Sequence, residues 1–355
     1  MSGNKVVMEG RGFYNAHSQL QHSALRCGLP FLEQALASVP IPQPGHPFLV
    51  ADYGSSEGRN SVEVMRLVVR EIRRRASWSV PISIVHIDQP GNDFSSLFDL
   101  LHSSPNSYLR DTSDVFAYAT GGSFYDQLFP QNQVSLGWSA IAIHWLSRLP
   151  EAVPHHIGTN HAPPQLKRTY AEQARQDWRR FLEHRAQELQ RGARLVVLAG
   201  AADVQGRYGG EPLYEVANHA LQELVRDGLL HAGEYARMTV PTYHRTQEEF
   251  AEPLRSEALR GRLVLEGQSQ VEMADPIWER YSVNGDMKGF AVEQTAWLRA
   301  WSEPSLFRDL DPDRTPEVRQ AIIEAFYTLV RELILRDPPS ARCAWRLAVL
   351  LIAKA

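Results

Sequence analysis

Two aspartates stand at the ends of apolar runs, where polar groups could bind a ligand. Asp52 ends the run 48–52, and Asp88 ends the run 82–88. The stretch from about 60 to 76 between them has a helical pattern, so the three segments predict a β-α-β unit. In doubly wound folds, a carboxylate at the tip of the second strand binds the two hydroxyls of a ribose. The spacing therefore predicts a site for an adenosine-containing cofactor, with Asp88 as its ribose ligand.

The turn after the first strand indicates which cofactor this is. A dinucleotide fold uses three glycines, so that the backbone can approach a pyrophosphate at a helix N-terminus. Here the turn contains only Gly54 and Gly58, and Asp52 precedes them. A carboxylate there would repel a pyrophosphate, but it suits the ammonium and sulfonium groups of S-adenosylmethionine. An ordinary strand-to-helix turn is the alternative interpretation.

Composition limits the class of protein. The 355 residues are 43% hydrophobic, which is enough for a large core. The formal net charge of -4 gives no sign of a nucleic-acid or membrane partner. Cys27 and Cys343 lie far apart in the sequence, which is typical of reduced, structural thiols. Without an apolar signal segment or a run of membrane-spanning length, we expect a cytoplasmic protein.

Further strands and helices are expected to alternate along the chain. The fold class that this predicts is α/β, a Rossmann-like doubly wound sheet with helices on both faces. Aromatic-rich stretches at 144–164 and 211–303 do not fit a minimal nucleotide fold, and insertions of this kind build substrate pockets. The additional strands are predicted near 115–119, 134–139, 194–200 and 345–352, and the additional helices near 20–36, 93–101, 165–190 and 211–230.

Four segments in this order resemble the SABATH family of carboxyl methyltransferases, which also includes N-methyltransferases of the caffeine pathway. Weaker similarity continues to the C-terminus, and the predominance of arginine over lysine favours a bacterial member. The segments are Tyr14–Gln21, Ala51–Asn60, Asp88–Phe94 with Gly122–Pro130, and His144–Pro150. The resemblance implies a single methyltransferase unit and a homodimer. Its cofactor-binding core would span about 40–210 and 305–355, and its substrate-pocket cap about 1–39, 144–164 and 211–304.

The resemblance also implies roles for individual residues. Gln21 and Trp145 would hydrogen-bond the carboxylate of the substrate, and Asp88 would bind the ribose. The cofactor would contact Tyr14, Ser18, Asp52, Ser55, Asn60, Asp88, Gln89, Ser123 and Phe124. The acid would contact Gln21, Ile141, His144, Trp145, Leu213, Tyr214 and Tyr243.

The implied chemistry is consistent with these residue types. A carboxylate is ionised at neutral pH, because its unperturbed pKa is about 4, so it needs no general base to attack a methyl group. Two neutral donors, the amide of Gln21 and the indole of Trp145, can orient such an anion without suppressing its nucleophilicity. The implied function is methyl ester formation on a small, largely apolar aromatic, indolic or terpenoid acid. Apart from the resemblance, Gln21 could be a surface amide and Trp145 a core indole.

The sequence also departs from the family pattern. His17 replaces an asparagine, Ser55 a cysteine and Ile141 an aromatic residue, which leaves the identity of the acid open. Some members bind magnesium, but the segment 236–239 lacks the required carboxylate, so we expect no metal although Asn160 is present. The alternatives are an N-methyltransferase of a small heterocycle, an NAD-dependent oxidoreductase, and a cofactor-binding protein without turnover.

Overall fold

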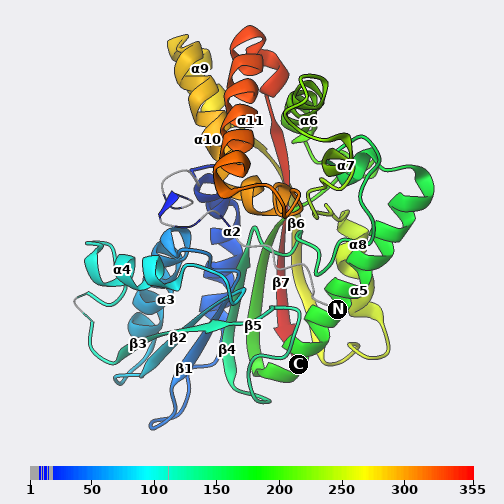
Figure 1. The fold of residues 1–355 in the computed structure, drawn as a ribbon. Coiled ribbons are helices and arrows are strands. Elements are labelled where there is room, and N and C mark those ends of the chain that lie inside the picture. The colour runs from blue at the N-terminus through cyan, green and yellow to red at the C-terminus, as the bar shows by residue number, and fades with distance from the viewer. Residues whose placement is uncertain (1–7, 9, 11, 14, 16–18, 111) are drawn as a thin grey trace.

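The computed structural model describes residues 8, 10, 12, 13, 15, 19–110 and 112–355. Within this part of the chain, seven strands form one sheet in the order β3-β2-β1-β4-β5-β7-β6 (Figure 1). The first five strands are parallel, and β7 is antiparallel to both of its neighbours. The strands are β1 Phe48–Tyr53, β2 Ile82–Asp88, β3 Val115–Gly121, β4 Val134–Ala140, β5 Leu189–Gly200, β6 Leu263–Ala274 and β7 Ala344–Lys354. The predicted α/β doubly wound class is confirmed.

Helices cover both faces of the sheet and gather above one end. The helices are α2 Gln19–Ser38, α3 Arg59–Arg75, α4 Phe94–Ser103, α5 Pro164–Glu188, α6 Glu211–Arg226, α7 Ala232–Tyr235, α8 Gln247–Ala251, α9 Pro276–Asn284, α10 Met287–Leu306 and α11 Pro316–Arg336. Short 3₁₀ segments span Thr159–His161, Glu252–Arg255 and Pro338–Ala341. In Figure 1, α6, α9, α10 and α11 stand above the sheet. None of the helices in the described residues is long and apolar enough to cross a membrane.

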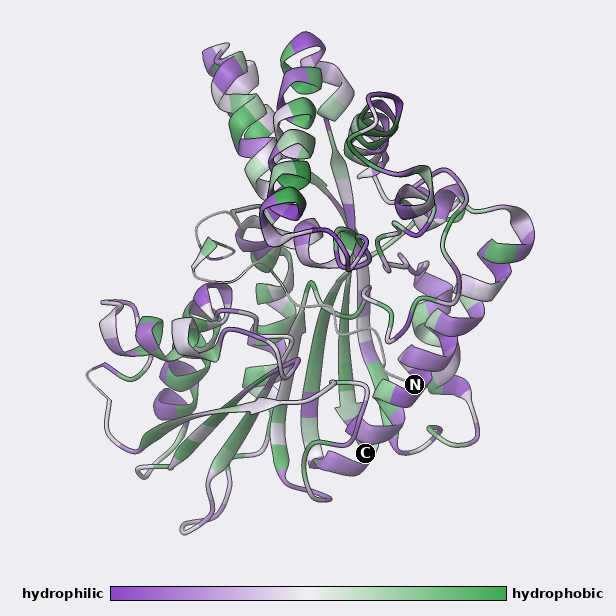
Figure 2. Cartoon of the chain, viewed as in Figure 1, coloured by the Kyte–Doolittle hydropathy of each residue, from purple (hydrophilic) through white to green (hydrophobic). Residues whose placement is uncertain are grey.

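The two faces of the sheet have separate cores because successive side chains of a strand point in opposite directions. In β5, Val196 and Leu198 pack with α2, α3 and α4, whereas Leu195 and Val197 pack with α5. Figure 2 shows predominantly hydrophobic central strands and a largely hydrophilic α5. Burial on both faces explains why these strands are continuous apolar runs in the sequence.

The predicted glycine turn follows β1. Gly54 and Gly58 have φ of 90° and 89°, a region that favours glycine. A Cβ on Gly54 would lie 2.4 Å from Cβ of Ala142, and a Cβ on Gly58 would lie 2.1 Å from Leu97. Both glycines therefore allow the turn to pack closely between β1 and α3, where the cofactor was predicted.

Two elements cross the predicted division into core and cap. The strand β6 lies within the range 211–304 that was assigned to the cap, yet it pairs with β7. The helix α11 lies within 305–355, yet it packs on α6 and α10. The division of the chain into core and cap stays a prediction.

Candidate functional site

Three hollows meet at the carboxyl ends of the parallel strands. One lies beside the glycine turn, the second beside Asp88, and the third below the helical layer. Ile141 lines all three, and it has a φ of 54°, which is rare for a β-branched residue. Such a conformation costs on the order of 1–3 kcal/mol and is concentrated at functional sites. Because it lines all three hollows, Ile141 lies where ligands in neighbouring hollows could approach each other.

Asp88 forms a two-point acceptor at the tip of β2. Its Oδ2 accepts the backbone N–H of Ser56 at 2.7 Å, and its Oδ1 accepts that of Gln89 at 2.7 Å. Each oxygen keeps a further lone pair, so the carboxylate can accept two adjacent hydroxyls. Burial raises the pKa of Asp88 to about 6, although both N–H groups oppose the rise. Gln89 and Phe124 line the same hollow, so these three predicted cofactor residues are brought together.

The neighbouring hollow is polar and buried. Asp52 is 2% exposed, and its Oδ2 lies 2.8 Å from Nδ1 of His86. Asp52, Ser55 and Asn60, three of the residues predicted to contact the cofactor, all line this hollow. The buried hydroxyls of Ser55 and Ser56 have no hydrogen-bond partner within the residues that the structure describes. Such unsatisfied groups fit a polar ligand end, such as the amino-acid end of S-adenosylmethionine.

Glu57 is a residue of this region that sequence reasoning missed. Its carboxylate accepts the N–H of Gly12 at 2.7 Å and that of Asn15 at 2.9 Å. It therefore links Gly12 and Asn15, near the N-terminus, to the glycine turn. The predicted residues Tyr14 and Ser18 lie outside the described residues.

The third hollow is an apolar cavity, which we call the substrate cavity. Among the described residues, no Asp, Glu, Lys or Arg lines it. Four predicted substrate residues besides Ile141 are brought together here: Gln21, His144, Trp145 and Tyr214. Sequence reasoning did not assign the other lining residues, which are Met8, Leu20, Ala24, Gly200, Thr242, His244, Met273, Trp297, Trp301, Trp345 and Leu347.

Two histidines, His144 and His244, form one wall of the substrate cavity, and Tyr208 packs behind His244. The rings of His144 and His244 stack with centroids 5.5 Å apart, and those of His244 and Tyr208 with centroids 4.1 Å apart. Burial, with Arg245 nearby, lowers the pKa of His144 to about 3. Burial also lowers the pKa of His244 well below its usual value. Both rings are therefore neutral near pH 7.

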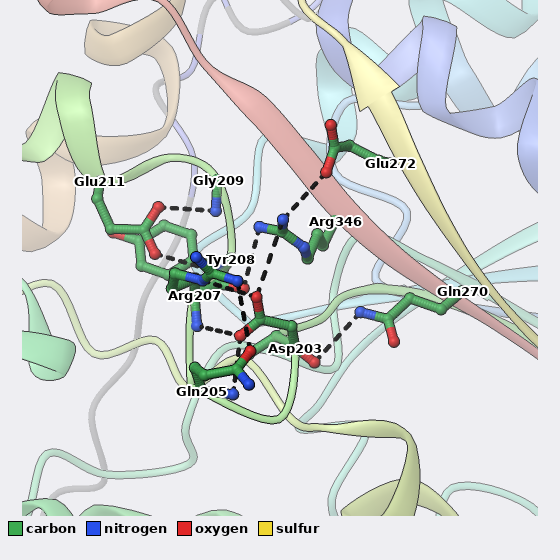
Figure 3. Close-up of polar contacts among 10 residues, drawn as sticks. Asp203, Gln205, Arg207, Tyr208, Gly209, Glu211, Gln270, Glu272 and Arg346 are labelled. Carbon is green, nitrogen blue, oxygen red and sulfur yellow. Dashed lines mark hydrogen bonds and ion pairs between the residues drawn. The ribbon is translucent and has the colours of Figure 1, made fainter.

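A polar network supports this wall from outside (Figure 3). Asp203 pairs with Arg207 at 2.8 Å, and Arg346 of β7 lies between Asp203 and Glu272. Glu211 accepts the backbone N–H of Tyr208 at 2.7 Å. These contacts fix the loop between β5 and α6, and with it the ring of Tyr208 against His244.

Three predicted residues lie outside these hollows. Leu213 is fully buried in the core beneath α6, one residue before Tyr214. Successive helix residues point about 100° apart, and here Tyr214 lines the cavity while Leu213 packs in the core. Tyr243 lines a separate groove, and its hydroxyl donates to Glu249 at 2.7 Å. Ser123 precedes Phe124, and its hydroxyl accepts the N–H of Tyr125 at 3.2 Å.

One cluster in the described residues has the composition of a metal site. It comprises His156, His161 and Glu215, with the two rings stacked 3.7 Å apart. However, Nδ1 of His156 accepts the N–H of Gly158 at 2.8 Å. In the neutral imidazole, Nε2 then carries the proton and cannot ligate a cation. The geometry of His156 therefore does not fit a metal ligand.

Comparison with known proteins identifies the family. The sequence matches the family described as SAM dependent carboxyl methyltransferase over residues 4–327. It is 31% identical to methyltransferase LUC1 of Fusarium sp over 253 residues, which cover 69% of this chain and 66% of that protein. It is 24% identical to the benzoic acid/salicylic acid carboxyl methyltransferase 3 of Petunia hybrida over 323 residues, 86% of this chain and 87% of that protein.

The fold agrees with this assignment. A solved structure described as loganic acid methyltransferase with SAH covers 98% of this chain and 99% of its own, with a TM-score of 0.76 and 21% identity. This likeness shows a shared fold. Because the family match covers most of the sequence, the chain belongs to the family of S-adenosylmethionine-dependent carboxyl methyltransferases.

Proposed function

We propose that this protein converts the carboxylate of a small, largely apolar acid to its methyl ester. The observation that carries the proposal is the position of Gln21 and Trp145, two neutral donors in an uncharged cavity that meets the cofactor hollows at Ile141. Within the described residues, neither the amide NH₂ of Gln21 nor the indole N–H of Trp145 has a hydrogen-bond partner. Both donors are therefore available to the two oxygens of a carboxylate.

Catalysis on this proposal consists of orientation. The acid is already ionised, so no protein group has to remove a proton. Gln21 and Trp145 fix the direction of the attacking oxygen, which can contribute several kcal/mol by holding two reactants in register. The apolar walls exclude water, which strengthens both hydrogen bonds.

We also propose how the cofactor is held. S-adenosylmethionine supplies an electrophilic methyl group on a sulfonium. Asp88 accepts the ribose hydroxyls, with Phe124 against the adenine, while Asp52, Ser55 and Asn60 surround the methionine end. The paired N–H groups on Asp88 and the unsatisfied hydroxyl of Ser55 support this arrangement.

An aromatic, indolic or terpenoid acid is supported as the substrate by the acids for which the relatives are named. The apolar lining of the substrate cavity supports the same class of acid. The test is a panel of such acids, incubated with methyl-labelled cofactor and analysed for methyl esters by mass spectrometry. Ester formation from at least one acid is expected. A product methylated only on nitrogen would instead establish the N-methyltransferase alternative.

The rate is expected to be independent of pH above about pH 6 at saturating concentrations of both substrates. Among the described residues that line the substrate cavity, none titrates there, because the pKa of His144 is about 3 and that of His244 is also depressed. Initial rates across overlapping buffers from pH 6 to 9 check this. A steep rise of kcat near pH 7 would instead indicate a general base.

Activity is expected to survive removal of divalent cations. The segment Ala236–Thr239 offers no carboxylate, and His156 presents a protonated nitrogen to the one candidate cluster in the described residues. The measurement is the rate of ester formation after EDTA treatment and gel filtration. Loss of activity that magnesium restores would contradict the expectation.

We further propose a cytoplasmic homodimer whose substrate-pocket cap, at about 1–39, 144–164 and 211–304, closes over the α/β core. The cap includes the helices α6 and α9 and most of α10. Family resemblance supports the dimer, and the gathering of these helices above the sheet supports the cap. Sedimentation velocity at micromolar concentration tests the dimer. A monomer at all concentrations would refute it.

A further inference from the structure

One hydrogen bond links the helical layer to the donor that faces the substrate. The indole Nε1–H of Trp297 on α10 donates to Oε1 of Gln21 on α2 at 3.0 Å. Both side chains are 7% exposed, and 276 residues separate them in the sequence. The direction of this hydrogen bond is defined, because an indole nitrogen can only donate.

The direction of this bond decides which end of the Gln21 amide faces the cavity. A primary amide can turn over and exchange its oxygen and its NH₂ group at little cost in shape. With Trp297 donating to it, the oxygen of Gln21 is already engaged, which leaves the NH₂ group as the end of the amide that a ligand can meet. The reversed amide would place two donors against each other and leave both unsatisfied.

The ring of Trp297 is itself held in place. It packs edge to face against Trp301, with centroids 5.5 Å apart, and against Trp345, with centroids 5.1 Å apart. These contacts come from α10 and from the start of β7, so they fix the ring from two directions. The direction of its N–H is therefore a property of the packed helical layer.

We propose that Trp297 is a positioning residue. By occupying the oxygen of Gln21, it leaves only a hydrogen-bond donor of that amide for the ligand, and this sets the preference of the site for a carboxylate over a carboxamide. This proposal rests on the proposed function, because it assumes that Gln21 faces the carboxylate. A carboxylate accepts from both Gln21 and Trp145. A carboxamide presents an NH₂ group to one of these donors and is disfavoured.

The test measures binding, so it does not depend on turnover. Affinities of benzoate and benzamide, and of indole-3-acetate and indole-3-acetamide, are measured by calorimetry with S-adenosylhomocysteine present. The wild type is expected to prefer each acid. In Trp297→Phe the amide of Gln21 can turn over, so the preference for acid over amide should fall about fivefold to tenfold. In a Gln21→Leu background, Trp297→Phe should leave the preference unchanged.

Trp178→Phe is the matched control. The indole of Trp178 also donates a buried hydrogen bond, to the carbonyl of Phe250 at 2.9 Å, but it lies in the core beneath α5, away from the cavity. Its loss should lower stability and leave the preference intact. If Trp297→Phe weakens acid and amide equally, Trp297 has only a structural role and the proposal is overturned, while ester formation by the wild type would still stand.

A second measurement covers the case in which Trp297→Phe does not fold. The indole N–H of Trp297 should exchange slowly with solvent in the wild type and faster in Gln21→Leu, while the N–H of Trp178 stays slow in both. Equal protection of Trp297 in the two proteins would show that Gln21 does not accept its hydrogen bond, which would overturn the proposal.

Discussion

Trp145→Phe is expected to lower kcat/KM for the acid by about tenfold to a hundredfold while leaving the melting temperature almost unchanged. The substitution keeps the apolar ring and removes only the N–H, which has no partner in the described part of the chain. The protein therefore loses no internal hydrogen bond. The reaction loses one of the two donors that direct the attacking oxygen. Initial rates with the best acid of the panel and thermal unfolding of the same preparations provide the measurement.

The control substitutes a tryptophan whose indole N–H does have a hydrogen-bond partner. Trp178→Phe removes an indole N–H that is bonded to the carbonyl of Phe250, far from the substrate cavity. It should lower the melting temperature and leave kcat/KM unchanged. If both variants lose activity in proportion to stability, Trp145 acts through packing and not as a donor.

Gln21→Leu should lose activity to a similar extent, but at a greater cost to stability. The leucine leaves the buried N–H of Trp297 without its acceptor, and an unsatisfied buried donor costs about 1–3 kcal/mol. The double variant of Gln21 and Trp145 should lose less activity than the product of the two single losses, because both donors hold one group. Multiplicative losses would show that the two residues act on different groups.

The part of the site nearest the glycine turn could be predicted from the sequence because its signals are local. A continuous apolar run, two glycines and a terminal carboxylate define the β1-α3-β2 unit within about forty residues, and they place Asp52 and Asp88 at the same edge of the sheet. Because adjacent parallel strands end at the same edge of the sheet, their pairing brings the two aspartates close together.

The far wall of the substrate cavity could not be predicted in the same way. Trp345 reaches the cavity because β7 runs antiparallel between β5 and β6, a pairing that joins segments about 70 to 160 residues apart. The strand β6 itself was missed because it is an edge strand with a partly exposed, polar sequence. The contact of Trp297 with Gln21 has no local signal at all, since only tertiary packing brings α10 beside α2.

Asp88→Ala is expected to weaken the binding of S-adenosylmethionine at least tenfold. The carboxylate offers the ribose two acceptors, and hydrogen bonds to an ionised group are roughly twice as strong as neutral ones. Its backbone donors, Ser56 and Gln89, hold both oxygens in place before the ligand arrives. Calorimetric titration of the wild type and the variant measures the change. An unchanged affinity would remove Asp88 from the cofactor site.

The raised pKa of Asp88 gives this prediction a second readout. Because its pKa in the free protein is about 6, the carboxyl is ionised at pH 7.5 and increasingly protonated below pH 6. A protonated carboxyl accepts hydroxyls poorly, so the affinity for S-adenosylhomocysteine should fall as the pH decreases, approaching tenfold per pH unit below the pKa. Asp88→Asn keeps the shape and cannot titrate, so its weaker binding should not vary between pH 5 and 8. A wild-type affinity as constant as that of Asp88→Asn would mean that the group at the tip of β2 is not the one that binds the ribose.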